Sequence, residues 1–259
     1  GTILSAAFFA VVVSSFTGSV IIGTLAAILV AMALSSIIFF AVRYLKANLF
    51  VVGIAVNLLS VGITVTLAYN WFLSKGTVVF SDSPRPVVLS LDFLTGSGFG
   101  WLNGLSLFDL SAFVVPLFLL LFFKKTSTGV KLRSCGFDEE SAFYSGVKVN
   151  DLRFLAYTGS GILSGLAGAA LSIPMGAFVS NMSGGRGWLA LVAVIMGRKN
   201  PLIVLLSALM LGFVTELSVF LQVATEISPK LLLSLPYFAS FIILAISYGE
   251  NKDKRFMDW

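Results

Sequence analysis

The residue types that commonly perform catalysis are sparse in this sequence of 259 residues. It contains no His and a single Cys, Cys135, which excludes imidazole catalysis, His-ligated metal sites and an internal disulfide. The glycine-rich segment TGSGFG at 95–100 lacks the Lys-Ser or Lys-Thr that completes a nucleotide-binding P-loop. We therefore expect a chain that is not an enzyme, with no catalytic residue, no metal site and no cofactor of its own.

Charge is concentrated in one island, residues 124–153, with the sequence KKTSTGVKLRSCGFDEESAFYSGVKVNDLR. It holds ten of the charged side chains, which in the whole chain comprise 17 Lys and Arg and 12 Asp and Glu. Uncharged stretches flank the island on both sides, at 110–123 and 154–185. The island is thus the polar interruption around which two apolar regions are arranged.

Within the island, GFDEESAFYSGV predicts a short helix. Asp138 is a good N-cap, and Gly146 suits the position just beyond the C-terminus. Glu139 and Glu140 would lie at the positive end of the helix dipole. The helix would offer a small apolar contact surface formed by Ala142 and Phe143. The alternative is an amphipathic surface helix that only joins two spanning segments.

The overall composition places the chain in a membrane. It is 58% hydrophobic and 11% charged, with mean hydropathy +0.99, whereas a soluble domain has about 25% charged residues. We expect an all-α integral membrane protein, a polytopic helical bundle with about seven or eight apolar segments. Residues 1–259 would form a single transmembrane domain, with 124–153 as a cytoplasmic loop. The chain lacks an initiator Met and begins inside an apolar segment, so we expect N-terminal residues to be missing.

Apolar runs bounded by charges, prolines and glycines give the expected segments. They cover 3–16, 19–42, 47–73, 108–123, 154–173, 188–197, 202–221 and 231–248. Residues 75–107 are expected to form an extramembrane loop. Pro174-Met175-Gly176 breaks a helix, 177–187 is expected to be irregular, and 188–197 is too short to span alone, so a re-entrant or broken helix is expected near 174–197. Close helix–helix approach is expected at four small residues, Gly159, Gly161, Gly165 and Gly168.

The distribution of basic residues predicts the orientation. Loops 43–48, 124–153 and 198–199, together with the C-terminal tail, contain 13 of the 17 Lys and Arg residues, so they are expected to be cytoplasmic. The net charge of +5 then reflects membrane orientation, and no nucleic-acid partner is expected. The expected partner is membrane lipid. Four basic side chains of the island would face the anionic inner leaflet, namely Lys124, Lys125, Lys131 and Arg133.

Residues 18–34 and 199–214 resemble each other faintly in the spacing of small and branched side chains. The expected orientation makes the first run inward and the second outward, which is what an inverted repeat gives. Chance similarity between apolar helices is the alternative.

Polar groups within apolar segments are the candidates for contact with a transported solute, because they are costly to place in lipid. The candidates for the substrate path are Asn57, Tyr157, Ser160 and Glu216, with two aromatic residues able to stack on a base, Phe178 and Trp188. Asn57 could instead form an interhelical hydrogen bond. Glu216 could instead snorkel outward or pair with Arg186.

Two longer segments resemble the permease subunits of bacterial ABC importers for ribose-like sugars and nucleosides. The first, LRSCGFDEESAFYSGVKVNDLRFLAYTGSGILSGLAGA, is similar to the family pattern LRA-x-G-x-N-x-x-A-A-x-x-x-G-I followed by SG-x-L-x-GLAG. The second, GGRGWLALVAVIMGRKNPLIVLLSALMLGFVTELSVFLQ with LPYFASFIILAI, resembles the signatures GRG-x-x-AL, GR-x-NP and LPY. The resemblance covers about residues 2 to 248 and is nearest the nucleoside branch. Cys135 and the pair Phe137-Asp138 depart from the family pattern.

The resemblance implies a multi-pass subunit of the bacterial cytoplasmic (inner) membrane that forms the path of an ATP-driven nucleoside importer. Arg133–Gly146 would be the coupling helix, seated on a cytoplasmic ATPase subunit that binds ATP and Mg. Other implied partners are a second, related permease, which favours a heterodimer, and an external substrate-binding protein or lipoprotein. The residues implied in ATPase coupling are Arg133, Gly136, Asp138, Glu139, Ala142, Phe143, Tyr144 and Gly146.

Two other functions stay open. One is an ABC importer permease for ribose-like simple sugars. The other is a stand-alone secondary transporter that uses Glu216 as a proton site. A third hypothesis is a membrane scaffold, which no residue of the sequence specifically supports.

Overall fold

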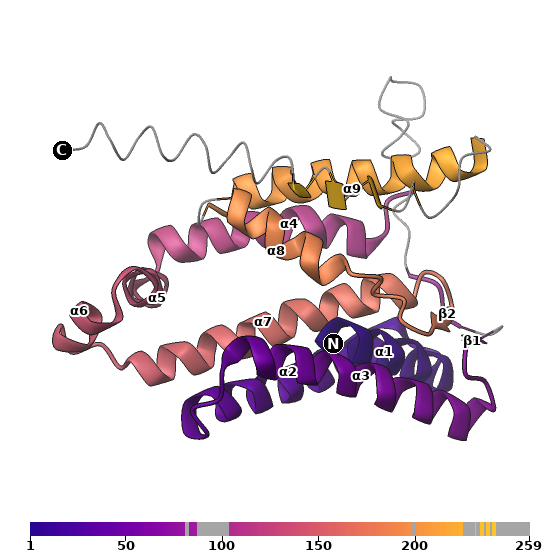
Figure 1. The fold of residues 1–259 in the computed structure, drawn as a ribbon, viewed down its shortest axis with the longest axis horizontal. Helices are drawn as coiled ribbons and strands as arrows, with labels where there is room; N and C mark the ends of the chain where they lie inside the picture. Colours follow the sequence, from indigo (N-terminus) through magenta and orange to yellow (C-terminus); the bar gives the residue numbers. More distant parts are fainter. Residues whose placement is uncertain are drawn as a thin grey trace. The chain divides into compact units, whose positions relative to one another are not determined.

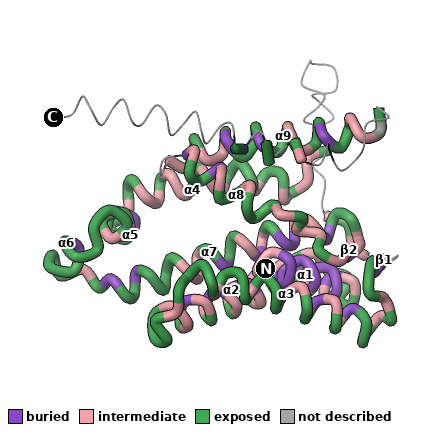
Figure 2. The backbone as a smooth tube through the Cα atoms, in the orientation of Figure 1, coloured by how far each residue is buried: buried purple, intermediate pink, exposed green. Residues whose placement is uncertain are grey.

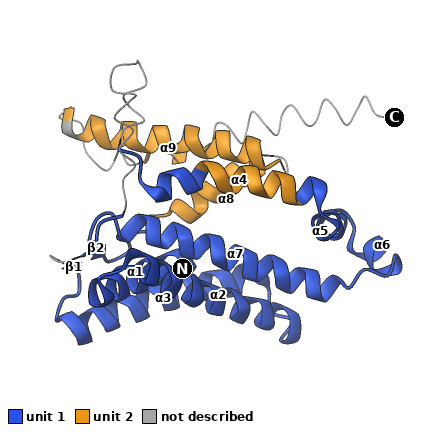
Figure 3. Ribbon diagram, turned by 180° about the vertical axis from the view of Figure 1, so that it is seen from behind, with its two compact units in different colours: residues 1–112, 123–184 blue, residues 113–122, 185–259 orange. Residues whose placement is uncertain are grey.

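A computed structural model describes residues 1–80, 83–86, 104–197 and 200–224, together with seven positions between 231 and 241. The chain divides into two compact units (Figure 3): unit 1 comprises Gly1–Ala112 and Phe123–Gly184, and unit 2 comprises Phe113–Phe122 and Gly185–Trp259. The elements in chain order (Figure 1) are α1 (Thr2–Thr17), α2 (Val20–Tyr44), α3 (Leu49–Phe72), β1 (Thr77–Val79), α4 (Leu107–Lys125), α5 (Ser127–Phe137), α6 (Glu139–Tyr144), α7 (Val149–Ser172), β2 (Ala177–Val179), α8 (Arg186–Met196) and α9 (Pro201–Ala224).

Five helices in the described part are long and apolar enough to span a membrane, namely α2, α3, α4, α7 and α9. α1 and α8 are apolar but shorter, with 16 and 11 residues. The all-α polytopic fold expected from composition is confirmed, apart from two strands of three residues each. The expected segment 231–248 lies largely outside the described residues. The glycine-rich segment 95–100, the pair 198–199 and the C-terminal tail lie wholly outside them.

α1 is the most deeply buried helix of unit 1 (Figure 2). It packs against α2, α3 and α7. Its Ala6, Ala10 and Ser14 follow one another at intervals of four residues and are fully buried, so they form one stripe of small side chains that lets neighbouring backbones approach. α2 presents a matching buried stripe of Gly23, Ala27, Ala31 and Ser35.

The glycines of α7 set its distance from α1 and α2. Gly161 and Gly165 face α2, where an added Cβ would lie 2.8 Å and 2.5 Å from a backbone Cα. Gly168 faces α1, where an added Cβ would lie 2.7 Å from a backbone nitrogen. The prediction of close approach is therefore confirmed at these three positions. It is wrong at Gly159, because an added Cβ there would meet nothing within 4 Å.

Two short strands join distant parts of unit 1. β1 pairs antiparallel with β2, and Val78 lies opposite Phe178. The Phe178 side chain is fully buried, and its ring meets that of Phe8 in α1 edge-on, with 5.0 Å between the centroids. The prediction that 177–187 is irregular is therefore wrong at β2, whose β-prone Phe and Val side chains extend the apolar core of α1.

The predicted helix break at Pro174-Met175-Gly176 is confirmed. α7 ends at Ser172, and Gly176 has a φ of +59°, a conformation that favours glycine. The next helix, α8, has 11 residues, about 16 Å of helix, and cannot alone cross a hydrocarbon core of about 30 Å. Within unit 2, α8 packs against α9.

Candidate functional site

The charged island folds into two short helices instead of the single helix predicted. α5 is capped at its N-terminus by Thr126, whose hydroxyl accepts a hydrogen bond from the Gly129 N–H at 3.0 Å. Asp138 then ends α5 and begins α6. Arg133 and Gly136, expected in the same helix as Glu139, therefore lie in α5. The helix that follows is shorter and turned by the extended backbone of Asp138, at φ −148° and ψ 110°.

The predicted caps of α6 are confirmed. The Asp138 carboxylate accepts hydrogen bonds from the N–H groups of Glu140 at 3.1 Å and Ser141 at 3.3 Å, and from the Ser141 hydroxyl. These bonds, the one from the Ser141 hydroxyl most of all, hold the pKa of Asp138 below its ordinary value. At the other end Gly146 adopts a φ of +79°, and its N–H donates to the Phe143 carbonyl.

The apolar surface of α6 differs from the one predicted. Ala142 is buried, and its carbonyl accepts a hydrogen bond from the Val147 N–H at 3.1 Å. Phe143 and Tyr144 instead point outward, with 66% and 84% of their surfaces exposed. Their rings meet edge-on, with 5.9 Å between the centroids. The exposed apolar surface of α6 therefore consists of these two aromatic rings.

One ion pair joins α6 to the membrane helix α7. Glu139, in the first turn of α6, accepts from the Arg153 guanidinium in the second turn of α7. The pair bridges the turn at Gly146, whose left-handed backbone reverses the chain between the two helices. α5 also packs against both α6 and α7. Sequence reasoning missed Arg153 because 14 residues separate the partners, and no helical spacing signals such a contact.

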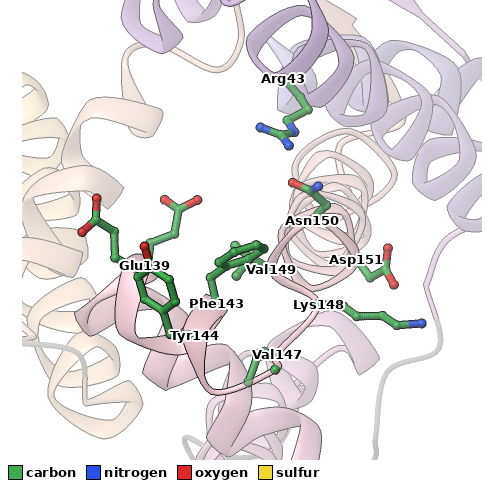
Figure 4. Close-up of a pocket in the computed structure, with 11 residues that line it drawn as sticks. Arg43, Glu139, Phe143, Tyr144, Val147, Lys148, Val149, Asn150 and Asp151 are labelled. Carbon is green, nitrogen blue, oxygen red and sulfur yellow. The ribbon is translucent and has the colours of Figure 1, made fainter.

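The end of α2 reaches the same place. A cleft of about 910 Å³ is lined by Arg43 of α2, by residues of α6 and by the turn and first residues of α7 (Figure 4). Arg43 points into the cleft toward Asn150, and Glu139 lies on the opposite side. The basic loops 43–48 and 124–153, which the charge distribution assigns to one side of the membrane, therefore meet at one end of unit 1.

The candidates for the substrate path are dispersed. Asn57 in α3 and Ser160 in α7 are exposed, while the Tyr157 ring packs on Phe39 of α2, with 5.6 Å between the centroids. Phe178 belongs to the core of unit 1, so its ring is not open to a solute in this conformation. In unit 2, Trp188 of α8 and Glu216 of α9 are exposed. Of the pockets found among the described residues, those of about 910, 490 and 350 Å³ contain at most one of these candidates, Tyr157.

The described residues contain no group of three or more His, Cys, Asp or Glu side chains that could hold a metal ion. The described part of the charged island forms helix caps and an ion pair. It presents a capped helix with two aromatic rings, and it ties that helix to a membrane helix.

Comparison with known proteins gives a consistent result. The family described as "Branched-chain amino acid transport system / permease component" matches residues 1–246. TsgC13 of Haloferax volcanii, named as a candidate glucose ABC transporter permease protein, is 26% identical over 98% of this chain and 83% of its own length. NupC of Lactococcus lactis subsp. cremoris, named as a nucleoside ABC transporter permease protein, is 29% identical over 80% of this chain and 66% of its own. NupQ of Bacillus subtilis, named as a guanosine ABC transporter permease protein, is 27% identical over 79% of this chain and 66% of its own length.

No solved structure matches the chain. The family match nonetheless covers nearly the whole sequence, and the relatives carry out sugar and nucleoside permeation according to their names. The five long apolar helices agree with a multi-pass membrane protein. This chain therefore belongs to the family of membrane permease components of ABC transporters that includes sugar and nucleoside permeases.

Proposed function

We propose that this chain forms the path of an ATP-driven nucleoside importer, and that α6 is the element through which a cytoplasmic ATPase subunit moves it. The observation that supports the proposal is the capped helix α6, whose Phe143 and Tyr144 are exposed at the end of unit 1 that also holds the basic loops. Two exposed aromatic rings on a short helix fit a cleft in another protein. ATP and Mg would be bound by that partner.

The contacts around α6 supply the mechanical link. When the ATPase closes on nucleotide, it would displace α6, and the Glu139–Arg153 pair would pass the displacement to α7. α7 packs closely on α1 and α2 through its glycines, and near its start Phe154 and Tyr157 pack on Phe39 of α2, so a displacement of α7 would be passed on to its neighbours. Tilting of α7 would then alternate access to the path.

The names of NupC and NupQ support nucleosides as the substrate class. Asn57, Ser160 and Glu216 lie in spanning helices and are exposed in the isolated chain. Because polar groups in a membrane are costly to expose to lipid, these residues would face water or another subunit. We propose that they line the path together with Trp188, whose ring can stack on a base. Tyr157 and Phe178 are less favoured, because other rings already cover them.

The remaining partners follow from the same proposal. A second, related permease would complete the path and cover the exposed polar positions of this chain. A heterodimer is the arrangement we favour. An external substrate-binding protein or lipoprotein would deliver the nucleoside and would supply most of the selectivity.

The experiment is uptake of labelled nucleoside into vesicles that contain this chain with its co-purifying partners, with and without internal ATP. Ribose, glucose and leucine serve as competitors, since the family description and the relatives name sugars and branched-chain amino acids. ATP-dependent nucleoside uptake that none of them reduces is the expected result. If a sugar is the only competitor that reduces uptake, sugars would replace nucleosides as the proposed substrate class, and the ATP-driven mechanism would stand.

A second substrate class has specific support. TsgC13, whose name gives glucose as substrate, is matched over 83% of its length, more than either nucleoside relative. Uptake driven by a proton gradient without ATP would instead favour a stand-alone transporter. In that case Glu216→Gln would abolish uptake, whereas in the importer it is expected to change substrate affinity and leave the ATP requirement in place.

A further inference from the structure

A second, smaller pocket lies at the cytoplasmic end of unit 1, where α2 ends, α3 begins and α7 has completed one turn. It has a volume of about 350 Å³ and is lined by Phe39, Val42, Arg43, Lys46, Leu49, Arg153 and Tyr157. Three of these side chains are basic and none is acidic. They come from α2, from the α2–α3 connection and from α7, so the fold has brought them together from distant parts of the sequence.

The charge in this pocket is only partly neutralised. Arg153 pairs with Glu139, and a guanidinium with five N–H donors keeps further donors available after that pair forms. Within the described part of the chain, neither Arg43 nor Lys46 has a carboxylate partner. Like charges held around one small space repel each other, and such an arrangement is stabilised when an anion enters it.

The backbone at Lys46 has a left-handed conformation. α2 ends with a hydrogen bond from the Ala47 N–H to the Ala41 carbonyl at 3.3 Å, and Lys46 adopts a φ of +52°. Helices usually place glycine at this left-handed position. A lysine here keeps a strained backbone, and strained positions gather at binding sites.

We propose that this pocket binds the phosphate headgroup of an anionic lipid of the cytoplasmic leaflet. Lys46 would donate to the phosphate oxygens, and Arg153 would add its remaining donors. Arg43 lines both this pocket and the larger cleft, and its guanidinium would turn toward the phosphate. Basic pockets between spanning helices on the cytoplasmic side suit such headgroups. The proposal rests on the membrane orientation and is independent of the substrate. It also differs from general attraction by the lysines of the charged island, because it names one saturable site.

The surroundings of the pocket favour a lipid over a soluble anion. Phe39, Val42 and Leu49 form apolar walls beside the basic groups. The adjacent Tyr44, Leu45 and Phe50 are exposed. A free phosphate would use none of this apolar surface, whereas the acyl chains of a lipid would lie along it.

The test uses the purified transporter complex in detergent and native mass spectrometry to count bound molecules. The probes are dioctanoyl phosphatidylglycerol, dioctanoyl phosphatidylcholine and inorganic phosphate. The test variant is the double substitution Arg43→Gln/Lys46→Gln. The matched control is Lys124→Gln/Lys125→Gln, which removes the same charge from exposed positions in the last turn of α4. Thermal unfolding without lipid checks that both variants fold.

We expect one phosphatidylglycerol to bind per copy of this chain, at least about tenfold more tightly than phosphatidylcholine. The pocket variant should lose about tenfold in that affinity, and the control less than about threefold. Equal losses in the two variants would overturn the proposal in favour of general surface attraction. Binding of inorganic phosphate at the same strength would overturn it in favour of a soluble anion, and absence of any preference for phosphatidylglycerol would also overturn it.

Discussion

The Glu139–Arg153 ion pair matters for its position more than for its strength. Both side chains are nearly half exposed, at 47% and 45%, and exposed ion pairs contribute about 0–1 kcal/mol to stability. The pair nevertheless joins α6, the helix that we propose contacts the ATPase, to α7, which is long and apolar enough to span the membrane. Removing it should therefore affect transmission of movement far more than folding.

We test this with the single substitutions Glu139→Arg and Arg153→Glu and with their combination. Each single change should reduce ATP-dependent uptake about fivefold or more while shifting the free energy of unfolding by less than about 1 kcal/mol. The combination restores the pair with reversed charges, so uptake should recover. The control combines Glu140→Arg with Arg153→Glu, which reverses the same charges at a position without the contact. Recovery in that control would show that net charge, and not the pair, is responsible.

Asp138 makes α6 sensitive to acid. Hydrogen bonds from the Ser141 hydroxyl and from backbone N–H groups lower its pKa below the ordinary 3.8. A carboxyl group whose pKa is lower in the folded state stabilises the fold above its unfolded pKa and loses that contribution as the pH falls through the folded pKa. The protection factors of the Glu140 and Ser141 amides, which compare exchange with that of an unfolded amide at the same pH, should thus be high at neutral pH and fall only below pH 3.8. Asp138→Ala should remove the protection at every pH, and Asp138→Asn should retain it without the acid transition. Wild-type protection in Asp138→Ala would contradict the capping role.

At the scale of elements, the sequence predicted where several helices begin and end, but it did not predict how the helices pack. The N-cap at Asp138, the left-handed Gly146 and the helix break before Gly176 follow from single residue types with strong conformational preferences. The burial of α1 could not be predicted, because 3–16 is uncharged like several other apolar segments, and its lipid-facing and core-facing sides have similar composition. The β1–β2 pairing could not be predicted either, since it depends on two short segments far apart in the chain.

The glycines of α7 give a matched test of that packing. Gly165→Ala would place a Cβ 2.5 Å from the Ile28 Cα, whereas Gly159→Ala meets nothing within 4 Å. The first should destabilise the protein by about 1–3 kcal/mol through overpacking. The second should be neutral or stabilise it by about 0.5–1 kcal/mol, because alanine favours a helix. Thermal unfolding in detergent compares the two variants. Equal midpoints would show that α7 does not pack on α2 as described.

At the scale of the whole molecule, the distribution of Lys and Arg predicted the arrangement of the loops better than the polar residues of the apolar segments predicted a substrate path. The distribution of Lys and Arg brought loops 43–48 and 124–153 to one side, and the structure places them around one cleft. The structure does not test the substrate path, because its candidates lie in two separate units and, in the proposed importer, a second permease would complete the path. The similarity of 18–34 to 199–214 falls on α2 in one unit and α9 in the other, and the inverted repeat stays a prediction.

The assembly with the ATPase offers the decisive whole-molecule test. Phe143 and Tyr144 are exposed, so changing both to Asp leaves the core of this chain intact, whereas Ala142 is buried and its replacement would disturb α6 itself. Because desolvated aromatic residues dominate protein interfaces, Phe143→Asp/Tyr144→Asp should abolish co-purification of the ATPase and ATP-dependent uptake together. The conservative pair Phe143→Leu/Tyr144→Phe keeps the apolar surface and should retain both. An ATPase that stays bound to the Asp variant would show that another surface of the chain holds it, and α6 would then be a tether between spanning helices.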